Sequence, residues 1–126
     1  MKRILIADDH SLIRAGLKQL MSAESDIEVI EAGNSTEVFL SIRNKPVDIV
    51  VLDISMPGEN GLDTLKELNR KYPEIPVLIL SVYPEDQYAL RAFKLGASGY
   101  LTKDSAPDEL LIAIRKILKG GKYASA

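Results

Sequence analysis

The sequence has 126 residues, the length of one domain, and is long enough to bury a core without disulfides. It contains no cysteine and one histidine, which excludes disulfide frameworks, thiolate zinc sites, cysteine nucleophiles and multi-histidine metal sites. The formal net charge of −2 argues against nucleic-acid binding by this chain itself. No apolar run approaches the roughly 20 residues of a membrane helix, and no signal peptide precedes the first acidic residues. We therefore expect a cytoplasmic protein without membrane association.

Five short apolar runs alternate along the chain with longer amphipathic segments. We expect strands at residues 3–7, 27–32, 48–52, 77–81 and 99–102. The first, third and fourth runs are almost continuously apolar, which is typical of strands buried on both faces of a parallel sheet. The second run alternates and the fifth is short, so both are expected at the edges of the sheet.

The segments between the runs carry apolar residues at helical spacing. Asn34 followed by Glu37 predicts the N-cap of the second helix, Pro73 ends the third, and Ser105 predicts the N-cap of the fifth. The expected inward residues are Leu12, Ile13, Gly16, Leu17, Leu20 and Met21; then Val38, Phe39 and Ile42; then Leu62, Leu65 and Leu68; then Ala89, Leu90 and Phe93; and finally Leu110, Leu111, Ile114, Ile117 and Leu118.

Five strand–helix units predict an α/β fold with helices on both faces of a parallel sheet. The expected architecture is a (βα)5 flavodoxin-like doubly wound sheet with strand order 2-1-3-4-5. We expect one domain over residues 1–119. The glycine-rich stretch 120–126 is expected to begin a linker to a following domain outside this chain.

Polar residues follow or end four of the predicted strands. Asp8 and Asp9 follow the first, Asp53 the third and Lys103 the fifth, while Ser81 ends the fourth. Each of these residues alone is more often a loop acid, a solvated lysine or a strand-end hydroxyl. In a sheet with this strand order, however, the carboxyl ends of the strands meet near the switch point between the first and third strands. Their joint placement therefore predicts a functional site.

Three neighbouring carboxylates repel one another and suit a hard cation. Mg²⁺ prefers oxygen ligands, and a site without cysteine, in which we expect no histidine, disfavours zinc and copper. His10 is expected at a helix start or on the surface. In this setting Asp53 can act as a nucleophile that forms an acyl phosphate, while Lys103 and the cation neutralise the charge of the phosphoryl oxygens.

The run DISMPGENG at residues 53–61, with the acidic pair upstream and Lys103 downstream, resembles the receiver domain of two-component response regulators across essentially the whole chain. The start DDH at 8–10, GYLTKD at 99–104 and the tail GGKY at 120–123 are most similar to the NarL/FixJ (LuxR-type) subfamily. The resemblance implies a signalling phosphoacceptor and not a classical enzyme. It implies Asp53 as phosphoacceptor, Lys103 as phosphate-binding lysine, Ser81 and Tyr100 as switch residues, and Mg²⁺ held by Asp8, Asp9, Asp53 and the backbone carbonyl of Ser55.

The resemblance also implies partners. A sensor histidine kinase is the expected phosphodonor, and DNA is bound only through an output domain that is not in this chain. We expect a phosphorylation-dependent homodimer, formed either by the face of the fourth helix, fifth strand and fifth helix or by the first and fifth helices. One residue departs from the pattern: Asp104 follows Lys103 where many receivers have proline, often after a cis peptide, so the geometry of this peptide stays open.

Other functions are less well supported. A phosphatase with an aspartyl nucleophile would need an acid two residues after Asp53, where this chain has Ser55. An FMN carrier would need a hydroxyl- and glycine-rich phosphate loop where Asp8 and Asp9 lie. A phosphorylation-independent interaction module and a single-domain response regulator also remain open.

Overall fold

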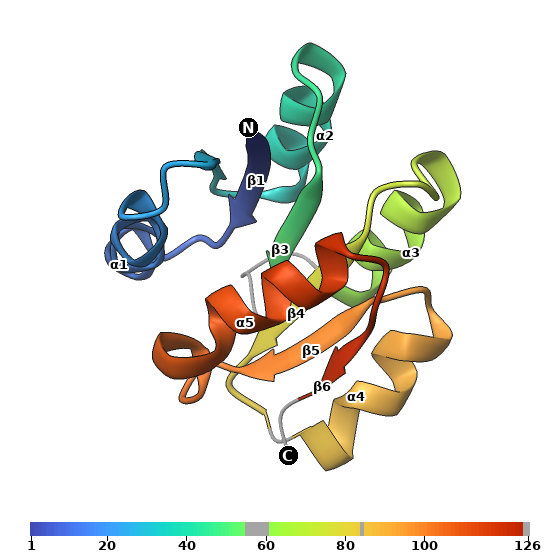
Figure 1. Cartoon of the computed structure of the whole chain (residues 1–126). Coiled ribbons are helices and arrows are strands. Elements are labelled where there is room, and N and C mark those ends of the chain that lie inside the picture. Colours follow the sequence, from blue (N-terminus) through green and yellow to red (C-terminus); the bar gives the residue numbers. More distant parts are fainter. Residues whose placement is uncertain (55–60, 84, 125–126) are drawn as a thin grey trace.

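The computed structural model describes residues 1–54, 61–83 and 85–124, which form a parallel sheet covered by helices on both faces (Figure 1). The strands are β1 (Lys2–Ala7), β2 (Ile27–Ala32), β3 (Ile49–Asp53), β4 (Val77–Ser81), β5 (Gly99–Thr102) and β6 (Tyr123–Ala124). The helices are α1 (Ser11–Ser22), α2 (Ser35–Asn44), α3 (Gly61–Lys71), α4 (Glu85–Lys94) and α5 (Ala106–Leu118). The strand order is β2-β1-β3-β4-β5-β6, which confirms the predicted order and adds a sixth strand.

The central strands are buried on both faces, as their apolar runs predict. Every residue of β3 and β4 is buried. Successive side chains of a strand point to opposite faces, so Val50 and Leu52 pack into one core while Ile49 and Val51 pack into the other. Parallel pairing brings the carboxyl ends of β1, β3, β4 and β5 to one end of the sheet.

Two separate cores lie on the two faces of the sheet. The first core includes buried residues of α2, α3 and α4, such as Val38, Leu65 and Ala92. The second includes buried residues of α1 and α5, such as Met21 and Ile114. None of the helices in the described part of the chain combines the length and apolar character needed to cross a bilayer.

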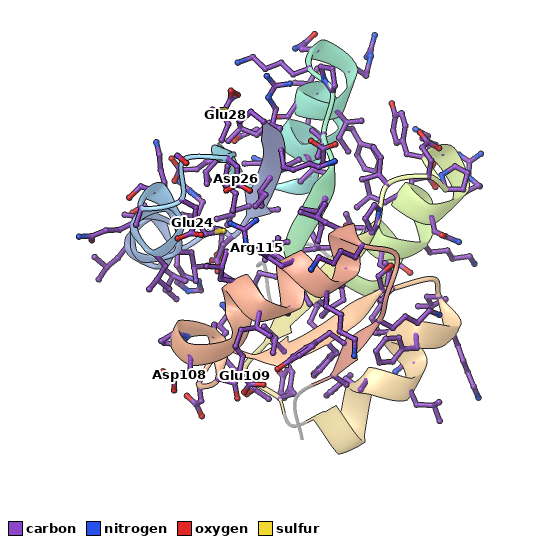
Figure 2. The ribbon with its side chains drawn as sticks, viewed as in Figure 1. Glu24, Asp26, Glu28, Asp108, Glu109 and Arg115 are labelled. Atoms are coloured by element: carbon purple, nitrogen blue, oxygen red, sulfur yellow. The ribbon has the colours of Figure 1, made fainter. Side chains whose placement is uncertain are left out.

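Ion pairs tie α5 to the segment between α1 and β2. Figure 2 shows Arg115 beside Glu24 and Asp26. Arg115 Nη1 lies 2.8 Å from Asp26 Oδ2, and Arg115 Nη2 lies 2.8 Å from Glu24 Oε1. This arginine therefore contacts both carboxylates near the amino-terminal end of β2.

The predicted cap of α2 is confirmed, and that of α5 is correct in position only. Asn34 Oδ1 accepts a hydrogen bond from the Glu37 amide at 2.9 Å, and Glu37 Oε1 accepts one from the Gly33 amide at 2.9 Å. Ser105 occupies the N-cap of α5, but its hydroxyl makes no capping bond and lies 3.0 Å from Thr102 Oγ1.

The predicted inward faces of α1 and α4 are partly wrong. Leu17 and Met21 are buried, but Leu12 is 84% exposed, Leu20 44% and Ile13 36%. At 100° per residue Leu12 and Leu17 point about 140° apart, so they cannot share one narrow face. For the same reason Leu90 is 66% exposed, because it points almost opposite to the buried Ala92.

The tail extends the sheet, so the predicted edge position of β5 is wrong. Tyr123 and Ala124 pair in parallel with Gly99 and Tyr100. Gly120, with φ of +93°, adopts a backbone conformation that favours glycine and turns the chain back after α5. The first residues expected to form a linker are therefore packed against the domain.

Candidate functional site

The carboxyl end of the sheet gathers the predicted site residues. Asp8 and Asp9 directly follow β1, Asp53 is the last residue of β3, and Lys103 directly follows β5. Ser81 is the last residue of β4 and is buried. Residues that are far apart in sequence therefore lie at one end of the fold, as the strand order predicts.

Lys103 bridges two buried carboxylates. Its Nζ donates a hydrogen bond to Asp53 Oδ2 at 3.0 Å and forms an ion pair with Asp8 Oδ2 at 3.2 Å. The Lys103 side chain is only 14% exposed. Burial lowers the pKa of Lys103, but the hydrogen bond and charge of Asp53 and the charge of Asp8 outweigh it, so the pKa lies above 10.5. The lysine is therefore charged at neutral pH, and it alone does not balance three carboxylates.

The turn after β1 holds the acidic pair. Asp8 Oδ1 accepts a hydrogen bond from the His10 amide at 2.8 Å, and the guanidinium of Arg14 donates to the Asp8 carbonyl. Within the described residues, the buried oxygens Asp8 Oδ2 and Asp9 Oδ1 have no hydrogen-bond donor, although each is in an ion pair. Buried carboxylate oxygens that lack donors fit a divalent cation with oxygen ligands.

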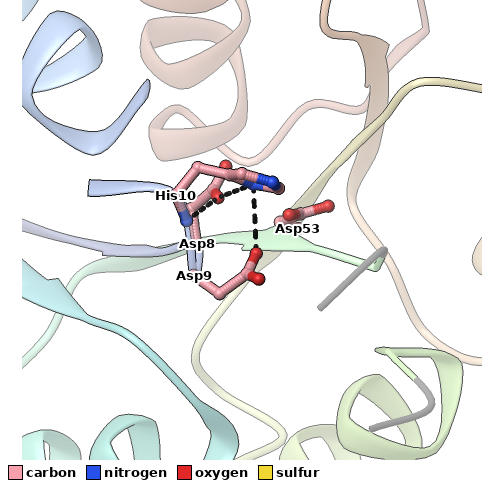
Figure 3. A group of neighbouring side chains, drawn as sticks. All are labelled: Asp8, Asp9, His10 and Asp53. Carbon is pink, nitrogen blue, oxygen red and sulfur yellow. Dashed lines mark hydrogen bonds and ion pairs between the residues drawn. The ribbon is translucent and has the colours of Figure 1, made fainter. Parts of the chain in front are cut away.

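His10 also belongs to this cluster, and the expectation of a site without histidine is wrong. Figure 3 shows its ring above the acidic pair and near Asp53. His10 Nδ1 lies 3.1 Å from Oδ1 of both Asp8 and Asp9. One ligand atom from each of these residues and from Asp53 can be chosen so that all lie within 4.8 Å of one another. Its place directly after the acidic pair is the signal that could have identified it.

Ser81 and Tyr100 both contact the backbone of Tyr83, in the loop after β4. Ser81 Oγ accepts a hydrogen bond from the Tyr83 amide at 2.9 Å, and the Tyr100 hydroxyl donates to the Tyr83 carbonyl at 3.0 Å. Tyr100 is fully buried and already lies inward. A movement of the Ser81 hydroxyl would therefore disturb the loop that Tyr100 holds.

Two remaining expectations concern the backbone. Ser55 lies outside the described residues. The described part of the chain contains no cis peptide bond, so the peptide between Lys103 and Asp104 is trans.

Comparison with known proteins gives a consistent result. A family model described as "Response regulator receiver domain" matches residues 4–115. "Transcriptional regulatory protein DegU" of Brevibacillus brevis is 36% identical over 122 residues, which cover 96% of this chain and 52% of DegU. "Oxygen regulatory protein NreC" of Staphylococcus haemolyticus (strain JCSC1435) is 33% identical over 123 residues, which cover 96% of this chain and 57% of NreC. The chain thus spans about half the length of these two relatives.

Solved structures agree with these sequence relatives. A two-component response regulator of the LuxR family from Aurantimonas sp. SI85-9A1 superposes with a TM-score of 0.90 at 35% identity, covering 96% of this chain and 87% of that chain. A CheY-like response regulator receiver domain protein from Methanospirillum hungatei JF-1 superposes with a TM-score of 0.86 at 28% identity, covering 95% of each chain.

Proposed function

Since this chain belongs to the family of response regulator receiver domains, we propose that Asp53 is its phosphoacceptor and that a sensor histidine kinase is the donor. One observation carries the proposal. Asp53 is a fully buried carboxylate whose Oδ2 lies 3.0 Å from a charged lysine, at the end of the sheet where Asp8 and Asp9 also lie. A buried acid at this position needs a role that outweighs the cost of its burial.

The proposed transfer is a single displacement at phosphorus. An oxygen of the Asp53 carboxylate attacks the phosphorus of the kinase phosphohistidine, so an O–P bond forms and the P–N bond breaks. The electron pair of the P–N bond returns to the kinase imidazole, and the product is an acyl phosphate on Asp53. Lys103 already contacts Asp53, so its ammonium is placed to pair with the new phosphoryl oxygens.

The proposed cofactor is Mg²⁺, held by Asp8, Asp9, Asp53 and the backbone carbonyl of Ser55. When bound, it neutralises charge on the phosphoryl oxygens. The two buried oxygens without donors, on Asp8 and Asp9, support this assignment. The protein acts as a signalling phosphoacceptor and catalyses only its own phosphorylation and dephosphorylation.

The proposed switch involves Ser81, Tyr83 and Tyr100. Ser81 Oγ now accepts a hydrogen bond from the Tyr83 amide. If the hydroxyl turns to bond a phosphoryl oxygen, that amide loses its acceptor and the loop before α4 rearranges. Because the Tyr100 hydroxyl holds the Tyr83 carbonyl, the change reaches β5 and the faces beside it. Phosphate biases this shift only through contacts that differ between the two states.

We further propose that the protein is a cytoplasmic transcription regulator of the LuxR type. Residues 1–119 form the receiver, Tyr123 and Ala124 add a strand to its sheet, and the output is a helix-turn-helix domain that binds DNA. The names of DegU and of the LuxR-family structure support this part. Phosphorylation is expected to drive homodimerisation through the α4–β5–α5 face or through α1 and α5.

Intact mass spectrometry tests the phosphoacceptor directly. After incubation with acetyl phosphate and Mg²⁺, the wild type should gain the mass of one phosphoryl group, and Asp53→Asn should gain none. Asp63→Asn, which changes an exposed aspartate in the first turn of α3, is the matched control and should behave like the wild type. Equal gains in mass for the wild type and Asp53→Asn would refute the proposal. Light scattering on the same samples tests dimerisation.

A further inference from the structure

His10 is the only histidine of the sequence, and the proposed phosphotransfer does not use it. It occupies the N-cap of α1, yet its side chain makes no capping hydrogen bond. The side chain is 54% exposed, so burial does not force the ring toward the carboxylates. Instead, Nδ1 of the ring lies within hydrogen-bond distance of Asp8 Oδ1, and this contact holds the ring over the acidic pair.

The contacts of His10 Nδ1 are hydrogen-bond distances when this nitrogen carries the ring proton. They also match the spacing of ligands around one ion when the proton is on Nε2, which leaves the Nδ1 lone pair free. Adjacent ligands of an octahedral ion lie about 3.0 Å apart when each is about 2.1 Å from the ion. His10 Nδ1 is 3.1 Å from Asp8 Oδ1 and 3.1 Å from Asp9 Oδ1. The cluster also contains the buried oxygen Asp8 Oδ2, which forms an ion pair with Lys103 Nζ at 3.2 Å.

We propose that His10 Nδ1 is an additional protein ligand for borderline divalent cations, so that it raises the affinity of this site for Co²⁺ or Zn²⁺ but not for Mg²⁺. The inference rests on the proposed function, because it assumes that the acidic cluster is the cation site. Imidazole suits cobalt, nickel and zinc, whereas Mg²⁺ prefers oxygen ligands and keeps several waters. His10 thus sets the metal preference of the site and is not required for Mg²⁺ binding.

Replacement of His10 should affect the affinities for Co²⁺ and Mg²⁺ differently, and this difference distinguishes a metal ligand from a residue with a purely structural role. Replacing His10 with alanine should weaken Co²⁺ binding at least about tenfold, because a ligand is lost. The same change should leave Mg²⁺ affinity unchanged or slightly higher, since the ring no longer contacts the two carboxylates. A His10 that merely holds the turn together would change both affinities in the same direction.

Calorimetric titration of protein without an affinity tag, using Co²⁺ alone and Mg²⁺ alone, provides the test. The variants are His10→Ala and His10→Asn, and the latter keeps a favourable N-cap residue. Asp9→Asn is the comparison variant and should weaken the binding of both Co²⁺ and Mg²⁺. Thermal unfolding without metal shows whether each variant is folded, and His10→Asn keeps the test valid if His10→Ala is not.

NMR of the imidazole nitrogens gives a second measurement. Because the chain has one histidine, its ring gives one pair of ¹⁵N signals. Zn²⁺ should shift the Nδ1 signal of the wild type, and this result supports direct ligation. An unchanged Nδ1 signal at saturating Zn²⁺, or equal losses of Co²⁺ and Mg²⁺ affinity in the His10 variants, would overturn the inference.

The outcome is independent of phosphorylation. If Mg²⁺ still supports phosphorylation of Asp53 while the Co²⁺ affinity of the His10 variants stays at the wild-type value, this inference fails and the proposed function stands. If the wild type binds Co²⁺ through His10 but acetyl phosphate and Mg²⁺ add no mass, the proposed function fails and the metal ligand stands.

Discussion

The two ends of the sheet carry similar charged residues but pair them in different ways. At the amino-terminal end, Arg3 Nε lies 2.7 Å from Glu28 Oε1, and the Arg3 amide donates to Asp48 Oδ2 at 2.7 Å. Arg115 pairs with Asp26 and Glu24 at the same end. Each of these carboxylates has a nearby donor.

At the amino-terminal end, the arginines balance the charges of the carboxylates. A hydrogen bond from Arg115 holds the pKa of Asp26 below its ordinary value, and one from Arg3 does the same for the pKa of Glu28. These pairs are partly exposed, so each contributes little to stability. They are typical of structural ion pairs.

At the carboxyl end, the acids outnumber their partner. Asp8 and Asp53 share Lys103, and Asp9 Oδ1 lies 3.1 Å from the half-exposed ring of His10, so one ammonium faces three carboxylates. Such an arrangement costs stability unless a ligand completes it. Unbalanced charge, and not charge alone, therefore distinguishes the binding site from the structural ion pairs.

Removing Lys103 should have the largest effect on stability. Lys103→Met leaves two buried carboxylates without their ammonium, so the free energy of unfolding at pH 7 in EDTA should fall by about 3 kcal/mol. Urea unfolding followed by circular dichroism measures the change, and Mg²⁺ should restore part of it.

The matched control is Lys71→Met, because Lys71 forms an exposed pair with Glu67 at 3.4 Å. Its loss should stay under about 1 kcal/mol. Equal losses for the two variants would contradict the contrast between a buried and an exposed partner.

Neutralising one acid at each end should change stability in opposite directions. Asp9→Asn relieves repulsion at the carboxyl end, so the free energy of unfolding in EDTA should rise by up to about 1 kcal/mol. Glu28→Gln removes the partner of Arg3, so the same quantity should fall slightly. Urea unfolding measures both variants, and titration with Mg²⁺ should show weaker binding only for Asp9→Asn. A loss of stability in both variants would remove the distinction between the two ends.

The acid dependence of stability should show the smallest effect. Because the folded pKa of Asp26 is lowered, its contribution is present above the ordinary value of 3.8 and is lost as the pH falls below it. Arg115→Met removes this contribution, so stability should depend less steeply on pH between about 5 and 3. Urea midpoints across this range provide the measurement. Arg43→Met, at an exposed position of α2, is the control, and slopes that match in all three proteins would exclude the proposed role of Arg115.

Much of the fold could be predicted because its signals are local. The strands 27–32, 77–81 and 99–102 begin and end where expected, and the Asn34 cap forms as the pair with Glu37 predicts. The sixth strand could not be predicted, since the pairing of Tyr123 and Ala124 with β5 depends on where the packing of α5 leaves the end of the chain. A two-residue strand carries no periodic pattern of its own.

The candidate site likewise has features that the sequence predicts and features that it does not predict. Its acids and its lysine were found from their positions after predicted strands. The near-complete burial of Lys103 and the orientation of the His10 ring could not be predicted from the sequence, because both depend on contacts across the fold. Lys103 and Asp53 are 50 residues apart in sequence.

The residues at the strand ends follow from local pattern, because hydrophobic periodicity sets the strands and strand order sets their neighbours. The pairing of these residues follows from the packing of the folded chain. Arg115 reaches both Glu24 and Asp26, while Asp8 and Asp53 share Lys103. The physical reason is that the energy of a charge depends on distances of a few ångströms and on burial, and packing of the whole chain sets both.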